Sequence, residues 1–237
     1  MSRRLLAEFI GTALLVAAVI GSGIAASRLS PHDAGLQLLE NAAATAAALV
    51  AIILAVGAAS GAHLNPLVTL ADRWLGGVST RDATGYVVAQ IGGGIVGAIT
   101  ANLMFSLPAV ALSTKTRSSG GIWLAEGVAT FGLLLVVFGV VRSARAAAPF
   151  AVGAYVGAAY FFTASTSFAN PAVTIARTLS DTFAGIRPSS VPPFLVAQAA
   201  GAVVAVAALA VLYPTIHDVA GDVVVPHEES GVRARHP

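Results

Sequence analysis

The sequence contains no cysteine and little charge. Without cysteine, disulfides, thiolate metal sites and cysteine nucleophiles are excluded, and we expect no sensitivity to mercurial thiol reagents. Charged residues make up 10% of the 237 residues, whereas soluble domains have about 25%. The formal net charge of +2 is too small to favour a nucleic-acid partner. Strand-like alternation of apolar and polar residues is also missing, which argues against a membrane β-barrel.

The residues that are present form long apolar runs. The chain is 57% hydrophobic, with a mean hydropathy of +0.83. Six apolar segments are long enough to cross a bilayer as helices, at 4–26, 38–58, 83–106, 121–142, 148–165 and 191–213. The first resembles a signal peptide, but its length and Glu8 favour a membrane span. The sequence predicts an all-α membrane protein with one domain over 1–213 and a disordered cytoplasmic tail over 214–237.

A short motif occurs twice within this apolar chain. SGAHLNPLVT begins at Ser60, and SFANPAVT begins at Ser167. An Asn-Pro pair interrupts a helix or starts one. The stretches 65–75 and 170–179 are too short to cross a bilayer, so we expect two re-entrant half-helices. Irregular backbone before them is tolerated at membrane depth only where it lines a cavity.

The two halves of the chain match beyond this motif. Each carries a glutamate, a motif asparagine and a glutamine in the same order: Glu8, Asn65 and Gln90 in residues 4–106, and Glu126, Asn170 and Gln198 in residues 121–213. Each half holds three expected spans, an odd number, so the second half inserts upside down as an inverted repeat. The two Asn-Pro loops then enter from opposite faces and meet near the bilayer midplane.

Arginine and lysine favour an orientation with both termini in the cytoplasm. With the N-terminus inside, the cytoplasmic set is Arg3, Arg4, Arg73, Arg81, Arg142, Arg145, Arg233 and Arg235. The smaller outer set is Arg28, Lys115, Arg117 and Arg187. We therefore expect a multi-pass protein of the inner (plasma) membrane.

Together these residues resemble the aquaporins of the major intrinsic protein family. The resemblance covers nearly the whole chain and depends on both motifs, on the two membrane glutamates and on the duplicated order. It implies six transmembrane helices with two half-helices, a narrow pore in each protomer and a homotetramer in the lipid bilayer. No cofactor is implied, and His63 is a lone histidine that cannot make a zinc site.

The resemblance also assigns roles to the motif residues. The two pore motifs are Asn65, Pro66 and Leu67, and Asn170, Pro171 and Ala172. Each asparagine amide would donate to a passing oxygen while its own oxygen caps the half-helix. The positive half-helix ends would oppose cations and proton hopping.

Further roles fall on the loops and the membrane carboxylates. Backbone carbonyls near Gly61 and Thr166 would line the pore as acceptors, and His63 would line it too, with plain packing as the alternative. Glu8 and Glu126 would accept hydrogen bonds from the loop backbones, with a proton relay as the alternative.

The selectivity filter departs from the family's pattern. Members usually have an arginine three residues after the second motif asparagine, where this chain has Val173. Counting back from each asparagine places the other filter positions at Thr45, Ala158 and Ser167. This set is small, uncharged and free of aromatic rings, so it predicts a pore wider than that of a water-only channel.

Two further residues bear on the pore's width and charge. Arg177 lies four residues beyond Val173 and would either add charge to the outer vestibule or interact with the helix C-terminus and snorkel outward. Leu67 replaces the alanine of the first motif, which could tighten the midpoint.

The leading interpretation is a passive channel for water and small neutral solutes such as glycerol. The stretch 165–186 resembles a bacterial subgroup, some of it associated with arsenic resistance, so trivalent arsenic hydroxide is a further candidate. A water-selective channel is the first alternative. A coupled secondary transporter would need Glu8 or Glu126 as a carrier. A non-channel alternative, an intramembrane hydrolase using His63 and a serine, lacks a G-x-S-x-G nucleophile motif.

Overall fold

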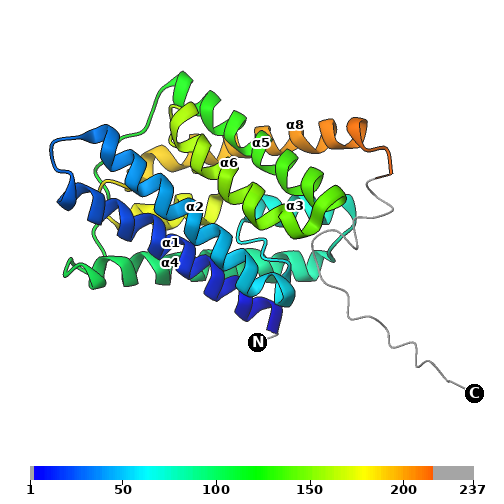
Figure 1. The fold of residues 1–237 in the computed structure, drawn as a ribbon, viewed down its shortest axis with the longest axis horizontal. Coiled ribbons are helices and arrows are strands. Elements are labelled where there is room, and N and C mark those ends of the chain that lie inside the picture. The colour runs from blue at the N-terminus through cyan, green and yellow to red at the C-terminus, as the bar shows by residue number, and fades with distance from the viewer. Residues whose placement is uncertain (1–2, 216–237) are drawn as a thin grey trace, which may run out of the picture.

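The computed structural model describes residues 3–215, and this part of the chain is helical without strands. Six long helices run side by side along the long axis (Figure 1): α1 (Arg3–Leu29), α2 (Ala34–Ser60), α4 (Thr80–Met104), α5 (Gly120–Ala144), α6 (Ala148–Phe162) and α8 (Val191–Leu212). Five stretches of the described chain are long and apolar enough to cross a membrane, and one of them, Gly120–Phe162, contains both α5 and α6. All but the first two residues of the expected tail over 214–237 lie outside the described residues.

Two short helices start at the repeated motifs. They are α3 (Pro66–Leu75) and α7 (Pro171–Ala176), the second continued by the 3₁₀ turn η2 (Arg177–Leu179). The Oδ1 atom of Asn65 accepts a 2.9 Å hydrogen bond from the backbone N–H of Leu67. Asn170 caps α7 in the same way, 3.0 Å from the N–H of Ala172. Proline follows each cap because its fixed φ suits the first helical position and its missing N–H is not needed there.

The packing of the first half is repeated in the second half. Helix α1 packs against α4 and α2, and α5 packs in the same way against α8 and α6. The short helices α3 and α7 each contact both α4 and α8, so each touches a long helix of the other half. Across the halves, α2 also packs against α6. The chain therefore forms one bundle whose centre is occupied by the two motif loops.

Glycine sets the closest helix contacts at equivalent places in the two halves. A Cβ atom at Gly93 of α4 would lie 2.2 Å from the carbonyl oxygen of Phe9 in α1. A Cβ atom at Gly201 of α8 would lie 2.2 Å from the carbonyl oxygen of Gly127 in α5. Small residues let membrane helices approach this closely, and the approach brings the buried glutamates of α1 and α5 next to the loops.

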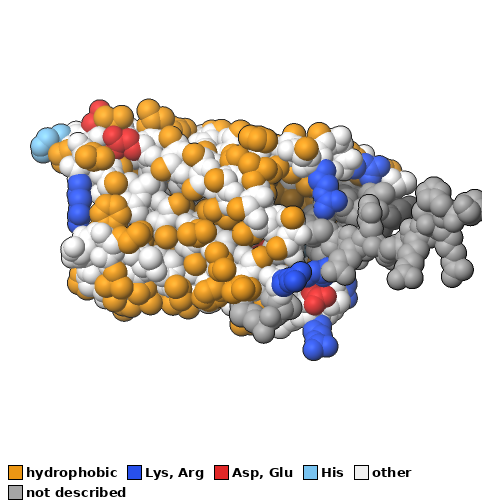
Figure 2. All heavy atoms as spheres, turned by 60° about the horizontal axis from the view of Figure 1, so that its bottom comes forward, with side chains coloured by type: hydrophobic (Ala, Val, Ile, Leu, Met, Phe, Trp, Pro, Cys, Tyr) orange, Lys and Arg blue, Asp and Glu red, His pale blue; other side chains and the backbone are white. Residues whose placement is uncertain are grey.

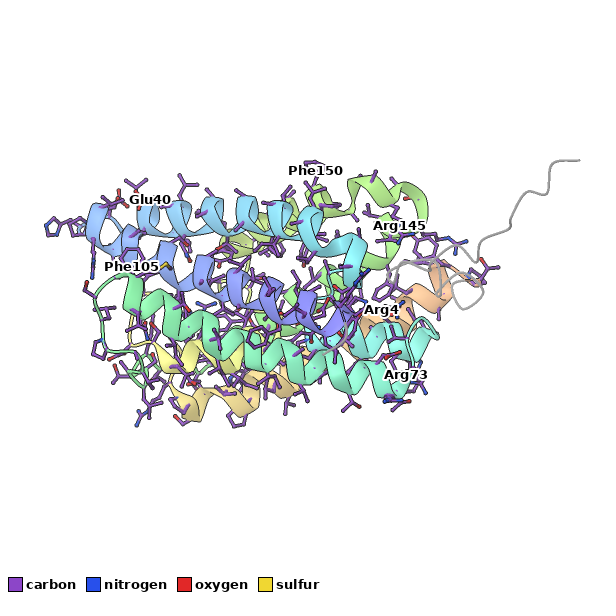
Figure 3. The ribbon with its side chains drawn as sticks, turned by 90° about the horizontal axis from the view of Figure 1, so that it is seen from below. Arg4, Glu40, Arg73, Phe105, Arg145 and Phe150 are labelled. Carbon is purple, nitrogen blue, oxygen red and sulfur yellow. The ribbon has the colours of Figure 1, made fainter. Side chains whose placement is uncertain are left out.

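The surface separates apolar sides from charged ends. Figure 2 shows hydrophobic side chains along the length of the molecule and charged side chains at its two ends. Arg4, Arg73 and Arg145 lie at the end where α1 begins, whereas Glu40 and Phe105 lie at the opposite end (Figure 3). This distribution suits a molecule that crosses a bilayer along its long axis.

Candidate pore

A cavity of about 550 Å³ passes between the two halves, and the motif loops form part of its wall. Near the end where α1 begins it is lined by residues such as Leu54, Ala58, Val141 and Arg145. Its middle is lined by His63, Leu64, Asn65, Ala169 and Asn170, and its other end by Thr45, Tyr160, Ser167, Val173 and Arg177. Most of the wall is apolar, with polar atoms concentrated in the loops.

The two motif asparagines meet at the middle of this cavity. The Nδ2 atom of Asn65 donates a 2.8 Å hydrogen bond to the carbonyl oxygen of Ala169. The Nδ2 atom of Asn170 donates in the same way, over 2.8 Å, to the carbonyl oxygen of Leu64. Each amide carries two hydrogens, so these bonds fix its orientation and leave the second hydrogen for a solute oxygen.

The loop backbones adopt the left-handed conformation at matching positions. In the first loop φ is 85° at Gly61, 50° at Ala62 and 52° at Leu64. In the second loop φ is 64° at Thr166, 49° at Ser167 and 46° at Ala169. Such values are uncommon for residues other than glycine and persist where surrounding contacts enforce them. The loops are therefore held in a conformation that two independent copies of the repeat share.

Two buried glutamates supply those contacts. Glu8 accepts hydrogen bonds from the backbone N–H groups of His63 at 2.9 Å and Leu64 at 2.7 Å. Glu126 accepts them from Phe168 at 2.9 Å and Ala169 at 3.0 Å. A buried carboxylate is tolerated when hydrogen-bond donors surround it. Each carboxylate therefore contacts the backbone of the loop that precedes a motif asparagine.

The glutamines of α4 and α8 complete each carboxylate site. Gln90 Nε2 lies 2.7 Å from Glu8 and 3.0 Å from the hydroxyl of Thr69. Gln198 Nε2 lies 2.6 Å from Glu126 and 3.0 Å from the hydroxyl of Thr174. Each glutamine therefore links a long helix to both a glutamate and a half-helix.

His63 lines the cavity, and its ring is also packed. Its Nδ1 atom lies 3.0 Å from the hydroxyl of Thr69, and its Nε2 atom lies 3.7 Å from a carboxylate oxygen of Asp72. The ring meets Tyr86 edge-on, with the centroids 5.1 Å apart. Among the described residues, no group of three or more histidine, aspartate or glutamate side chains is arranged to hold a metal ion.

Three of the four expected filter residues lie together at the outer part of the cavity. Thr45, Ser167 and Val173 line it, whereas Ala158 is exposed on the outer surface of α6. Tyr160 lines the cavity instead, with its hydroxyl 3.2 Å from that of Thr45. This part of the cavity wall therefore contains an aromatic ring, which corrects the expectation of a ring-free set. Helix α6 ends at Phe162, so counting back across the irregular segment to Asn170 does not give the helix face.

Other expected residues lie close to the cavity without lining it. Leu67 packs in a buried cluster with Leu134 and Phe138 and is not part of the cavity wall, so it does not tighten the midpoint. Thr166 is also outside the wall, unlike Gly61, its equivalent in the first loop. Pro66, Pro171 and Ala172 form the first turns of the half-helices behind the asparagines.

Arginine and phenylalanine side chains stack at the outer end. The guanidinium carbon of Arg177 lies 3.4 Å from the ring centroid of Phe168, and that of Arg117 lies 5.0 Å from it. Burial lowers the pKa of Arg177 to about 9, and the nearby Arg117 acts in the same direction. Burial lowers the pKa of Arg117 to about 10. Both guanidinium groups are therefore charged at neutral pH.

Sequence reasoning missed Tyr160, Phe168 and Asp72 as features of the site. For two of them, Phe168 and Asp72, the repeat in the sequence indicated a position equivalent to a residue already considered. Phe168 lies in the second loop where His63 lies in the first, two residues before each motif asparagine. Asp72 and Arg177 each lie seven residues after a motif asparagine. Equivalent positions in the two halves thus carry different chemistry.

Comparison with known proteins supports the same architecture. The family model described as "Major intrinsic protein" matches residues 1–169 and 144–234. An aquaglyceroporin, AqpS, of Rhizobium meliloti is 50% identical over 207 residues, covering 87% of this chain and 88% of the relative. A probable aquaporin, AqpM, of Archaeoglobus fulgidus is 31% identical over 216 residues, covering 78% and 86%.

A solved structure resembles the fold as well. The X-ray structure of the aquaglyceroporin from Plasmodium falciparum superposes with a TM-score of 0.67 at 24% identity. The match covers 90% of this chain and 98% of the other. This likeness supports the arrangement of helices and half-helices described above.

Proposed function

Because this chain belongs to the major intrinsic protein family, we propose that it is a passive channel for water and small neutral solutes, glycerol among them. The observation that carries this proposal is the cavity with two motif asparagines at its middle. Their amide hydrogens and the loop carbonyls offer a solute a few weak partners in an otherwise apolar wall. Weak, well-spaced binding permits rapid passage.

The outer filter suits a solute with one polar side and one apolar side. Thr45 and Tyr160 place two hydroxyl groups 3.2 Å apart on the wall, while Val173 contributes methyl groups. Glycerol has hydroxyl groups along one edge and carbon–hydrogen bonds along the other, so it can meet both surfaces at once. A relative is named an aquaglyceroporin, which is consistent with this solute class.

A direct test is glycerol uptake by cells that lack their own facilitator. Expression of this chain should raise the initial rate of labelled glycerol uptake, with no dependence on ion gradients. An unchanged rate, with the protein demonstrated in the membrane, would reject the proposal.

The alternative of a coupled transporter has less support. It requires a free carrier group at the midplane, but Glu8 accepts four hydrogen bonds and Glu126 accepts three. These two carboxylates hold the loops in place, and releasing either one would disturb the pore.

Trivalent arsenic hydroxide is a second candidate solute. It is neutral and carries hydroxyl groups, and no charged residue lies among Thr45, Tyr160, Ser167 and Val173. Arsenite-sensitive cells that express this chain should show both raised glycerol uptake and a changed tolerance to arsenite. Unchanged tolerance alongside raised glycerol uptake would exclude this solute.

We also propose a homotetramer in the inner membrane with cytoplasmic termini. The arginine-rich end that contains Arg4, Arg73 and Arg145 supports this orientation (Figure 3). Exposed apolar side chains such as Phe150 and Phe161 supply surface for lipid or for neighbouring copies. The mass of the detergent-solubilised protein, and protease access to a C-terminal tag, test the two parts separately.

A further inference from the structure

One charged side chain lines the outer end of the cavity where the filter itself carries no charge. Thr45, Tyr160, Ser167 and Val173 are all uncharged, and Arg177 lines the same end of the cavity. Arg177 is only 2% exposed, so its charge lies inside the molecule and not on the open surface. A solute that enters from this end must pass the guanidinium group.

The position of this guanidinium group is fixed on several sides. It lies 3.4 Å from the centroid of the Phe168 ring, and its Nε donates to the carbonyl oxygen of Ala184. Phe168 is in turn held edge-on against Phe194, with their centroids 5.2 Å apart. Arginine stacks well on aromatic faces because its guanidinium is planar and weakly hydrated. The charge is therefore held at the mouth and does not swing into solvent.

The positive charge of Arg177 makes no direct ion pair in the described part of the chain, and the carboxylate of Glu126 acts on it only beyond ion-pair distance. Within residues 3–215, no carboxylate lies within ion-pair distance of Arg177. Asp181, which is close in sequence, accepts instead from the N–H and hydroxyl of Thr114. Arg117 also lies over Phe168 and donates to the carbonyl oxygen of Gly185, so it adds a second positive charge to the same end.

The inverted repeat gives an internal comparison for this residue. Asp72 occupies the equivalent position in the first half, where its carboxylate lies 3.7 Å from His63. The equivalent position thus carries Asp72 beside the imidazole of His63 in the first half. In the second half it carries Arg177 against the ring of Phe168. Asp72 lies inside α3, whereas Arg177 begins the 3₁₀ turn η2 that follows α7, so the two halves differ here in backbone as well as in charge.

We propose that Arg177, held on the ring of Phe168, is the residue that excludes cations from this pore. The proposal rests on the channel function proposed above and extends it to selectivity. A cation at the mouth meets a positive charge that no ion pair among the described residues neutralises, in a region of low dielectric, where repulsion is stronger than in water. Glycerol and water carry no net charge and pass the same group, whose remaining N–H donors can hydrogen-bond to their oxygens.

The test compares charge and shape at position 177 in proteoliposomes. Arg177→Met removes the charge and keeps much of the length, whereas Arg177→Lys keeps the charge without the planar stack. Arg187→Met is the matched control, since Arg187 is an exposed arginine at the same end of the molecule. Potassium efflux and glycerol re-swelling are measured on the same preparation.

We expect Arg177→Met to raise potassium permeability about tenfold or more while glycerol permeability changes by less than about twofold. Arg177→Lys and Arg187→Met should remain as tight to potassium as the unaltered chain. If Arg177→Met fails to fold, Arg177→Gln replaces it, because its amide can still donate to Ala184.

Three results would overturn the proposal. The first is an Arg177→Met or Arg177→Gln channel that conducts glycerol and still excludes potassium. The second is an Arg177→Lys channel that leaks as much as Arg177→Met. The third is an unaltered chain that conducts both glycerol and potassium, which needs no variant. An unaltered chain that conducts neither water nor glycerol would instead reject the channel function itself.

Discussion

Val173 is the residue whose replacement should most directly change solute size selection. It lines the outer cavity beside Thr45 and Ser167. Val173→Arg adds a long charged side chain to this narrow region, so we expect glycerol permeability to fall about tenfold or more and water permeability by less than about threefold. Stopped-flow swelling of proteoliposomes measures both quantities.

Val173→Leu is the control for this change, because leucine adds side-chain volume without the charge or the length of arginine. An equal loss of water and glycerol passage in Val173→Arg would mean that the pore has collapsed. Unaltered passage of both would show that position 173 does not limit the pore.

Glu8 illustrates a residue whose effect is on stability. Its carboxylate accepts from the hydroxyl of Ser60 at 2.6 Å, as well as from two backbone N–H groups and Gln90. Glu8→Gln places an NH₂ group among these donors, so at least one buried donor loses its acceptor. We expect the free energy of unfolding to fall by about 2–4 kcal/mol, measured by thermal or denaturant unfolding in detergent.

Glu40→Gln is the matched control, because Glu40 lies at the outer end and, within residues 3–215, it accepts a hydrogen bond from Ser30 alone. It should change the unfolding free energy by about 0.5 kcal/mol or less. A Glu8→Gln protein as stable as this control would mean that Glu8 does not hold the loop.

At the scale of elements, the half-helices depend on their asparagine caps. Asn170→Asp keeps the oxygen that caps α7 but removes the Nδ2 donor to Leu64 and adds a negative charge at the pore centre. We expect the protein to fold, glycerol passage to fall about threefold or more, and cation leakage to rise. The measurements are proteoliposome swelling and potassium efflux.

Asn170→Ala separates the two roles of this side chain. It removes both cap and donor without adding charge, and should cost about 1–2 kcal/mol of stability. Cation leakage that rises equally in both variants would assign the effect to a distorted loop and not to the charge.

The contact between α5 and α8 depends on the absence of a side chain at Gly201. Gly201→Ala would place a Cβ atom 2.2 Å from the carbonyl oxygen of Gly127, so the helices must separate. We expect a loss of stability of about 1–3 kcal/mol, seen as a lower unfolding temperature in detergent.

Gly57→Ala tests whether this loss comes from packing. Gly57 also lies inside a helix, but a Cβ atom there would have no neighbour within 4 Å. This variant should be as stable as the unaltered chain or up to about 1 kcal/mol more stable. If Gly201→Ala is equally stable, the close approach does not contribute to folding.

The long helices were largely predictable from apolar runs, and their ends less so. The run 38–58 becomes α2 over Ala34–Ser60 because the helix starts at its cap, Asp33, which accepts from Leu36 N–H. The run 83–106 likewise begins early, at the Ser79 cap. The fifth expected span, 148–165, ends at Phe162, since Thr163 is already extended. Hydropathy finds the apolar stretch, whereas local capping sets the boundary.

The site residues that occur in both halves of the repeat were predictable from the sequence. Residues whose role depends on which face of a helix meets the cavity were not. Both asparagines, both glutamates and both glutamines followed from the duplicated order. Ala158 did not line the cavity, because a helix turns by about 100° per residue and the count from Asn170 crosses irregular backbone. The Arg177–Phe168 stack depends on distances in space that no spacing in the sequence reveals.

At the scale of the whole molecule, the inverted repeat accounts for a pore whose two halves are joined at its centre. Each half supplies one loop, one carboxylate that holds it and one asparagine that binds to the other half. The cross-half bonds from Asn65 to Ala169 and from Asn170 to Leu64 tie the halves together at the centre. Such a fixed central connection suits passive diffusion better than alternating access, in which the halves must move against one another.

The measurement that tests this account most directly is stopped-flow light scattering on proteoliposomes of the unaltered chain. An impermeant osmolyte should cause rapid shrinkage, much faster than in empty liposomes. Glycerol as the osmolyte should cause rapid shrinkage followed by rapid re-swelling, because both water and glycerol pass. Rapid shrinkage without re-swelling would show a water-selective pore and contradict the account of the filter, and shrinkage no faster than in empty liposomes would contradict the channel itself.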